Sequence, residues 1–243
     1  MRFYTGLVGV ALVGLVALSV GLGASGAVAG EEEGFRAIFD GKTLDGWDGN
    51  PKFWSVEEGT IVGQTTKENP TKGNTFLIWR GGKPADFELK AEFRMPNPGF
   101  ANSGIQIRSW ETTEKWRVCG YQPDMDSGNT YTGICYGEGF RGILAGRGEN
   151  VVIGPKGKKT VTKFAEAAEL GKAIKKQDWN EYHIIAQGNH ITQKINGQLM
   201  CELTDEDTVA RKDGIIAFQI HAGPPMKVQF RNIRLKETGA AAK

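Results

Sequence analysis

The chain has 243 residues and a formal net charge of +2 at pH 7, from 30 basic and 28 acidic residues. This near balance gives no sustained field that would attract a polyanion, so nucleic acid is excluded as an expected partner. The length suits one all-β domain with a full core, since such domains commonly stay undivided at this size. We therefore expect a single domain.

The N-terminal segment has the pattern of a secretory signal. Arg2 precedes an uncharged stretch, residues 3–30, whose end contains the small residues Ala27-Val28-Ala29. This predicts a signal peptide at residues 1–29 and a secreted or periplasmic domain at residues 30–243, with no membrane contact after cleavage. The competing interpretation is an N-terminal membrane anchor, because the uncharged stretch is long enough to span a bilayer.

Three cysteines in an exported protein allow at most one internal disulfide. A bond between Cys119 and Cys135 requires that the strands bring the two residues together, and the sequence leaves that question open. In this interpretation Cys201 is a buried thiol.

Short apolar runs separated by turn residues predict strands along the chain. A hairpin is expected at residues 53–63, and a further strand at residues 75–79. In residues 87–94 apolar and charged side chains alternate, so one face of this strand packs while the other is polar. Similar strands are expected at residues 104–110, 116–124 and 214–221.

Between residues 146 and 176 the pattern changes to a lysine- and glycine-rich turn and a short helical run, which predicts an excursion from the sheet. Strands resume at residues 179–186 and 191–195, and Asn196-Gly197 turns the chain into the next one. The last strand is expected at residues 226–235. Many short strands with at most one short helix predict an all-β fold, a jelly-roll sandwich of two antiparallel sheets.

On several of these strands the polar side chains occupy every second position and therefore share one face of the strand. Glutamine and arginine each make two hydrogen bonds in a fixed plane, which suits the hydroxyl and carbonyl groups of a sugar. The competing interpretation is that outward strand positions are polar in any sandwich with one wetted face. The residues predicted to line a ligand groove are Glu92, Arg94, Gln106, Arg108, Gln122, Asp124, Gln219 and His221, with Trp110 as a stacking aromatic.

Asp124, Asp126 and Glu138 are candidate acid/base carboxylates, and His221 is the histidine within the predicted groove. Histidine titrates near neutral pH unaided, whereas a carboxyl group does so only after desolvation. Loop capping or ion pairing is the competing role for each carboxylate. Residues 124–129 also resemble the start of a calcium loop but lack its later ligands, so no cofactor is required and a divalent metal is an alternative.

Five motifs stand out in chain order: residues 39–47, 102–106, 120–124, 136–141 and 230–233. Together they resemble the 3-keto-disaccharide hydrolase domain family, across almost the whole chain. The resemblance implies a concanavalin A-like sandwich in an exported protein that acts on oxidised carbohydrate.

A ketone at carbon 3 of a sugar acidifies the hydrogen on carbon 2, so a base can remove it and the anomeric substituent can leave before water adds back. This chemistry needs a base, an acid and a donor that polarises the ketone. The resemblance implies proton transfer by His221 with Asp124 or Glu138. It also implies ketone stabilisation by Arg108 with Gln106 and Gln122, and further substrate contacts from Asp126 and Arg141.

Two other functions stay open at this point. A non-catalytic, lectin-like glycan-binding module is one, because sandwich folds serve binding as readily as hydrolysis. An ordinary two-carboxylate glycosidase is the other. It requires two facing carboxyl groups roughly 5 to 10 Å apart, with Glu92 paired to Asp124 or Glu138.

Overall fold

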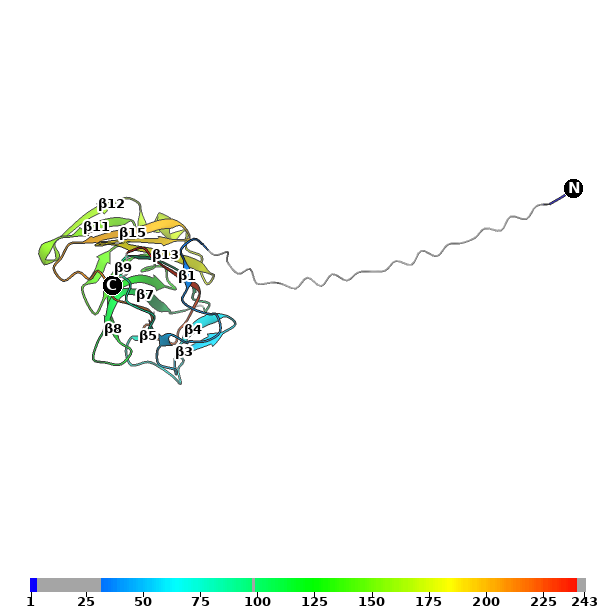
Figure 1. The fold of residues 1–243 in the computed structure, drawn as a ribbon, viewed down its shortest axis with the longest axis horizontal. Helices are drawn as coiled ribbons and strands as arrows, with labels where there is room; N and C mark the ends of the chain where they lie inside the picture. Colours follow the sequence, from blue (N-terminus) through cyan, green and yellow to red (C-terminus); the bar gives the residue numbers. More distant parts are fainter. Residues whose placement is uncertain (4–31, 98, 240–243) are drawn as a thin grey trace. The chain divides into compact units, whose positions relative to one another are not determined.

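The computed structural model describes residues 1–3, 32–97 and 99–239. Residues 32–239 hold two β-sheets that lie in separate layers (Figure 1). Apart from residues 1–3, the predicted signal peptide and its cleavage site lie outside the described residues. Within the described residues, no helix is both long enough and apolar enough to cross a membrane.

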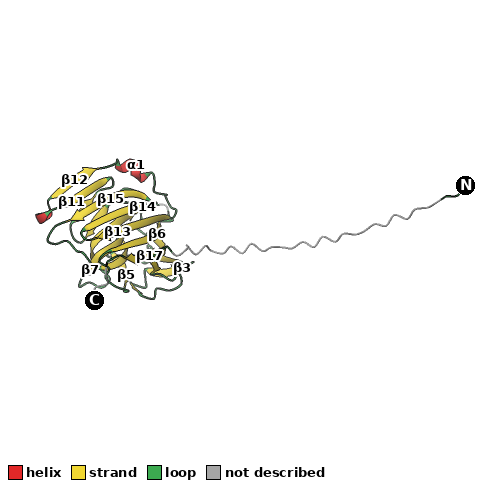
Figure 2. Ribbon diagram, turned by 45° about the horizontal axis from the view of Figure 1, so that its top comes forward, coloured by secondary structure: helices red, strands yellow, loops and turns green. Residues whose placement is uncertain are grey.

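The larger sheet has ten strands, in the order β12-β11-β15-β14-β13-β6-β17-β4-β3, with β1 paired to β17. Figure 2 shows most of these strands side by side. Their bounds are β1 (Arg36–Ala37), β3 (Trp54–Glu57), β4 (Thr60–Gln64), β6 (Phe87–Arg94), β11 (Glu149–Ile153), β12 (Lys159–Lys163), β13 (Asn180–Gln187), β14 (His190–Ile195), β15 (Gln198–Asp205) and β17 (Lys227–Glu237).

The smaller sheet has seven strands, in the order β10-β9-β8-β7-β16-β5-β2. Every pair of neighbours in it is antiparallel. Its strands are β2 (Trp47–Asp48), β5 (Thr75–Trp79), β7 (Asn102–Glu111), β8 (Val118–Asp126), β9 (Cys135–Glu138), β10 (Gly142–Ala145) and β16 (Ile215–Ile220).

The predicted excursion at residues 146–176 is wrong in part. The short helices η1 (Pro155–Gly157) and α1 (Ala167–Gly171) do lie there, but β11 and β12 extend the ten-stranded sheet. β11 joins it through a parallel pairing with β15. All five residues of β12 are exposed, so this strand carries no apolar alternation that would reveal it in the sequence.

The core lies between the two sheets. Phe218 on β16 stacks between Trp47 of its own sheet, at 5.1 Å, and Phe230 of the ten-stranded sheet, at 4.0 Å between ring centroids. Leu89 and Ile105 are fully buried, on the strand faces where their alternation predicts them. The all-β sandwich predicted from the sequence is confirmed.

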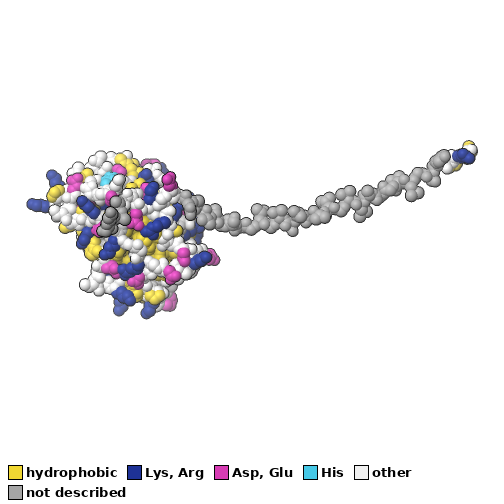
Figure 3. Space-filling view, viewed as in Figure 1, with side chains coloured by type: hydrophobic (Ala, Val, Ile, Leu, Met, Phe, Trp, Pro, Cys, Tyr) yellow, Lys and Arg dark blue, Asp and Glu magenta, His cyan; other side chains and the backbone are white. Residues whose placement is uncertain are grey.

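The seven-stranded sheet is also partly covered on its second face. A separate buried cluster there comprises Phe76, Ile78, Val118, Ile215 and Ala217. On the face of the domain shown in Figure 3, basic and acidic side chains are interspersed, as the near-zero net charge leads one to expect.

All three cysteines are free, so no Cys119–Cys135 disulfide forms. Strand pairing places Cys135 opposite Pro123, which is four residues from Cys119 on β8. That separation is about 13 Å along a strand, well beyond the reach of a disulfide. Cys201 is buried.

Candidate active site

One cavity of about 570 Å³ brings together the three residues predicted for proton transfer, His221, Asp124 and Glu138. Asp124 comes from β8 and Glu138 from β9, and His221 directly follows β16. The remaining lining residues are Asn74, Phe100, Asn102, Arg117, Gln122, Tyr131, Tyr136, Gly139 and Ile143.

Asp124 is buried, with only 6% of its surface exposed, and it is fixed by hydrogen bonds. Its Oδ1 accepts a hydrogen bond from the Met125 amide at 2.8 Å, and Tyr182 of the opposite sheet donates to its carbonyl oxygen at 2.8 Å. Burial raises the pKa of the Asp124 carboxyl well above its ordinary value, and the negative charges of Asp126 and Glu138 add to the rise. Asp124 therefore keeps its proton at a pH where an exposed aspartate has lost it, which suits a proton donor.

One ring nitrogen of His221 forms a hydrogen bond within the protein. Its Nδ1 lies 2.5 Å from the carbonyl oxygen of Ala222. A carbonyl oxygen only accepts hydrogen bonds, so Nδ1 carries the hydrogen and the neutral ring has its lone pair on Nε2. Phe100 packs edge-on against the ring, with 6.2 Å between centroids. This tautomer suits a proton acceptor in the cavity.

Glu138 is fixed by two side-chain amides. Asn74 donates to its Oε1 at 2.9 Å, and Gln219 donates to its Oε2 at 3.2 Å. Asn74 also accepts the backbone N–H of Ala222 at 2.9 Å, next to His221. Asn74 thus connects the segment that carries His221 to the carboxylate on β9.

Three buried glutamines continue this network across the sheet. Gln122 donates to Gln219 at 3.5 Å, and Gln106 donates to Gln122 at 2.5 Å. Gln122 lines the cavity, whereas Gln106 and Gln219 are fully buried behind it. A side chain at Gly104 would meet Gln122, since a Cβ built there lies 2.3 Å from the Gln122 Cγ. The glycine of the Asn-Ser-Gly-Ile-Gln motif therefore makes room for the glutamine.

Arg108 does not line the cavity. It has a positive φ of 46°, and the β7–β8 register shifts between Ile107 and Trp110. This bulge turns Arg108 into the structure, where it donates to the carbonyl oxygens of Ala85 and Gly188 at 2.7 and 2.8 Å. Trp110, beyond the same bulge, also lies outside the cavity. The predicted groove positions of both residues are wrong.

Glu92 and Arg94 also lie elsewhere, on β6 of the ten-stranded sheet. Glu92 forms an ion pair with Arg231 at 2.6 Å. Arg94 donates to Gln229 at 3.0 Å, and its guanidinium lies 4.6 Å from the ring centroid of Trp179. Strand alternation assigns a face but not a sheet, so their predicted position in the groove is wrong.

Asp126 caps the loop that follows β8. Its carboxylate accepts the backbone N–H groups of Thr130 at 3.0 Å, Tyr131 at 2.7 Å and Thr132 at 2.9 Å. In the structure Asp126 therefore has the role of loop capping, which was the competing interpretation for the candidate carboxylates. Across residues 32–97 and 99–239, no group of three or more histidine, cysteine, aspartate or glutamate side chains is placed to hold a metal ion.

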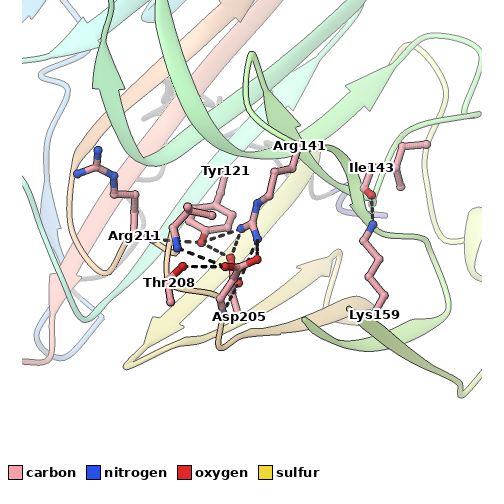
Figure 4. A network of polar contacts seen from close by, with 9 residues as sticks. Tyr121, Arg141, Ile143, Lys159, Asp205, Thr208 and Arg211 are labelled. Carbon is pink, nitrogen blue, oxygen red and sulfur yellow. Dashed lines mark hydrogen bonds and ion pairs between the residues drawn. The ribbon is translucent and has the colours of Figure 1, made fainter. Parts of the chain in front are cut away.

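Arg141 belongs to a different network, which Figure 4 shows. It forms an ion pair with the buried Asp205 of β15, and Tyr121 donates to the same carboxylate. Its guanidinium lies 4.3 Å from the ring centroid of Phe140. Arg141 therefore connects the turn after β9 to the opposite sheet rather than lining the cavity.

Sequence reasoning missed several cavity residues because they lie on loops or at strand ends. Arg117 is the arginine of the cavity and precedes β8, and Asn74 precedes β5. Phe100 and Tyr131 come from loops, where no periodicity marks an inward position. Tyr136 stands within the 136–141 motif, and that motif is the signal that could have identified it.

Comparison with known proteins decides the family. A family model described as the 3-keto-alpha-glucoside-1,2-lyase-like domain matches residues 34–236. The chain belongs to this family. The resemblance found in the sequence motifs is confirmed, and the chain is a carbohydrate-active, hydrolase-like domain.

The relatives are similar over different lengths. A 3-keto-disaccharide hydrolase of Bacteroides thetaiotaomicron is 34% identical over 96 residues, which is 35% of this chain and 31% of that protein. The match thus spans about a third of the relative.

Solved structures share the architecture. A Parabacteroides distasonis protein provisionally named a glycosyl hydrolase has a TM-score of 0.56 at 17% identity, over 85% of this chain and 95% of its own. The carbohydrate-binding module CBM66 of Bacillus subtilis has a TM-score of 0.53 at 13% identity, over 79% and 95%. At such identities these likenesses show the fold alone.

Proposed function

We propose that this domain cleaves 3-keto-glycosides by removing the hydrogen on carbon 2, expelling the anomeric substituent and adding water. The proposal rests on one observation, which is that a single cavity contains both a candidate proton acceptor and a candidate proton donor. His221 offers a free Nε2, and Asp124 is a buried carboxyl with a raised pKa. Family membership supports the same reaction class.

In the first half of the proposed reaction, Nε2 of His221 takes the proton from carbon 2 and an enolate forms at the ketone. Gln122 and Arg117 line the cavity and supply donors for the enolate oxygen, in place of Arg108. Asp124 then gives its proton to the leaving oxygen as the bond to carbon 1 breaks. The products are an unsaturated keto sugar and the free alcohol.

In the second half, the Asp124 carboxylate takes a proton from water as the oxygen adds to carbon 1. The His221 imidazolium returns a proton to carbon 2. Both residues are restored, and the net reaction is hydrolysis. Glu138, with both oxygens already accepting amides, has its role in fixing the donors around the sugar rather than in moving the proton.

The test is alcohol release from a 3-keto-glucoside by the purified protein, with and without an added divalent metal. We expect His221→Ala and Asp124→Asn each to lower kcat by about 10² to 10⁴. Asp124→Asn should still exchange the carbon 2 hydrogen with deuterated solvent, because the base remains. Glu92→Gln, on the other sheet, is the matched control and should keep full activity. Absence of release by the parent protein under every condition would reject the enzymatic proposal.

Two alternatives have specific support. Phe100 and Tyr131 are exposed aromatics at the cavity, which suits a glycan-binding module. Asp124 and Glu138 line one cavity, which suits a two-carboxylate glycosidase, whereas Glu92 lies on the other sheet and does not line that cavity. Turnover of unoxidised glycosides would favour the glycosidase, and glycan binding without any turnover would favour the module.

A further inference from the structure

Exposed apolar side chains gather around the candidate active site. Within residues 32–97 and 99–239 the exposed large hydrophobic residues are Phe100, Tyr131, Ile143, Val161, Phe164 and Val209. Phe100, Tyr131 and Ile143 all line the cavity of Asp124 and His221, at 43%, 46% and 51% exposure. Among the described residues of the domain, half of the exposed large apolar side chains therefore surround a single hollow, and such patches usually mark a binding surface.

Strand pairing arranges three of the lining residues in a row. Gln122 on β8 pairs with Tyr136 on β9, and Tyr136 pairs with Ile143 on β10. All three side chains line the cavity, so they stand on the same side of the sheet. Directly opposed residues lie about 5 Å apart, which places Ile143 about 10 Å from Gln122. Along this row the side chains change from an amide to a phenol to a pure hydrocarbon.

The proton-transfer groups stand at the polar end of this row. The sheet order β16, β7, β8, β9, β10 runs from the segment of His221, past Asp124, to Ile143. If the sugar ring lies between His221 and Asp124, the group attached to its anomeric oxygen extends past Asp124 over β9 and β10. A second sugar there would present hydroxyl groups to Ile143, which offers no hydrogen bond, and polar groups without partners oppose binding.

We infer that the site is built for a glycoside whose leaving group is an apolar, ring-bearing alcohol such as a phenol, with Ile143 as a specificity-determining residue. The inference rests on the proposed function and deepens it by naming the aglycone. Tyr131 and Tyr136 provide flat apolar faces for the ring of the leaving group, and Ile143 closes the far end.

The kinetic test compares phenyl 3-keto-glucoside with a 3-keto-disaccharide, in both anomers, for the parent protein and for Ile143→Ser. Intrinsic leaving-group reactivity cancels when the ratio of kcat/KM values is compared between the two proteins. We expect Ile143→Ser to lower the preference for the phenyl substrate about tenfold, the usual cost of lost apolar contact in a pocket. Val209→Ser, at the same 51% exposure but away from the cavity, should leave the ratio unchanged.

Binding provides a readout that does not need turnover. Isothermal titration of unoxidised phenyl glucoside and of a disaccharide should show tighter binding of the phenyl compound by the parent protein, and Ile143→Ser should remove that difference. Equal affinities, or a preference that survives Ile143→Ser, would overturn the inference. Should the parent release no alcohol from any 3-keto-glycoside while the binding preference depends on Ile143, the proposed reaction is wrong and the apolar subsite stands.

Discussion

At the residue scale, two carboxylates only two positions apart have opposite environments. Asp126 accepts three backbone N–H groups in its own loop, whereas Asp124 accepts one backbone N–H, that of Met125, and lies buried in the cavity wall. Both belong to the sequence Asp-Met-Asp, so residue type and spacing do not separate them. Their surroundings do, because Asp126 caps its own loop whereas burial raises the pKa of the Asp124 carboxyl.

The raised pKa of Asp124 predicts a pH-dependent cost to stability. Below the ordinary pKa of an aspartate, near 3.9, both folded and unfolded states hold the proton and there is no cost. As pH rises from there toward the raised folded pKa, only the unfolded state ionises, so the folded state loses stability. The loss has a maximum slope of about 1.4 kcal/mol per pH unit.

Asp124→Asn removes this titration and should become more stable than the parent as pH increases from 4 to 8. Urea unfolding across that range measures the difference in unfolding free energy. A difference that stays constant with pH would contradict the raised pKa of Asp124.

At the element scale, the hairpin of β9 and β10 is attached to the opposite sheet through Arg141 and Asp205 (Figure 4). Phe140, in the turn of this hairpin, packs edge-on against Tyr121 at 5.8 Å. Since Glu138 and Ile143 lie on the two strands of the hairpin, the ion pair helps to hold that side of the cavity in place.

Arg141→Met should destabilise the protein strongly, because it leaves the Asp205 carboxylate, only 3% exposed, without its cation. Breaking one side of a buried pair costs about 3–5 kcal/mol, measured by urea unfolding. Adding Asp205→Asn should recover part of the loss. Arg36→Met is the control, since the Arg36–Glu237 pair is about half exposed and should contribute at most about 1 kcal/mol. Equal losses for the two arginine variants would show that burial of the pair is unimportant.

At the scale of the whole molecule, the two sheets meet through stacked aromatic rings. Phe218 of the seven-stranded sheet is fully buried between Trp47 and Phe230. It directly precedes Gln219, which donates to Glu138. The packing of the sheets and the polar network of the cavity are therefore adjacent along one strand.

Phe218→Ala should lower the unfolding free energy by about 3–5 kcal/mol, because it opens a cavity between the sheets. Phe164→Ala, at a position that is 41% exposed, should change it by less than about 0.5 kcal/mol. Chemical denaturation of both variants measures the contrast. Similar small effects would mean that the ring stack contributes little to sheet packing.

Local patterns in the amino-acid sequence were enough to predict the sandwich class, the inward faces of the strands and the family. Strict alternation at residues 87–94 and apolar phase at Ile105 and Ile107 are local properties, since side chains alternate across any strand. Strand phase placed His221, Asp124 and Gln122 in one predicted groove, and Glu138 was predicted separately as a candidate acid/base carboxylate. All four line one cavity.

Which of the in-phase residues share that cavity became clear from the three-dimensional arrangement of the strands and not from their sequences. Glu92 and Arg94 have the required phase but belong to the other sheet, and Arg108 is turned inward by a bulge that adds one residue to β7. Phe100 and Tyr131 reach the cavity from loops without any period. Alternation fixes which face of a strand a side chain occupies, whereas strand pairing, bulges and loop paths fix its neighbours, and those depend on contacts distant in sequence.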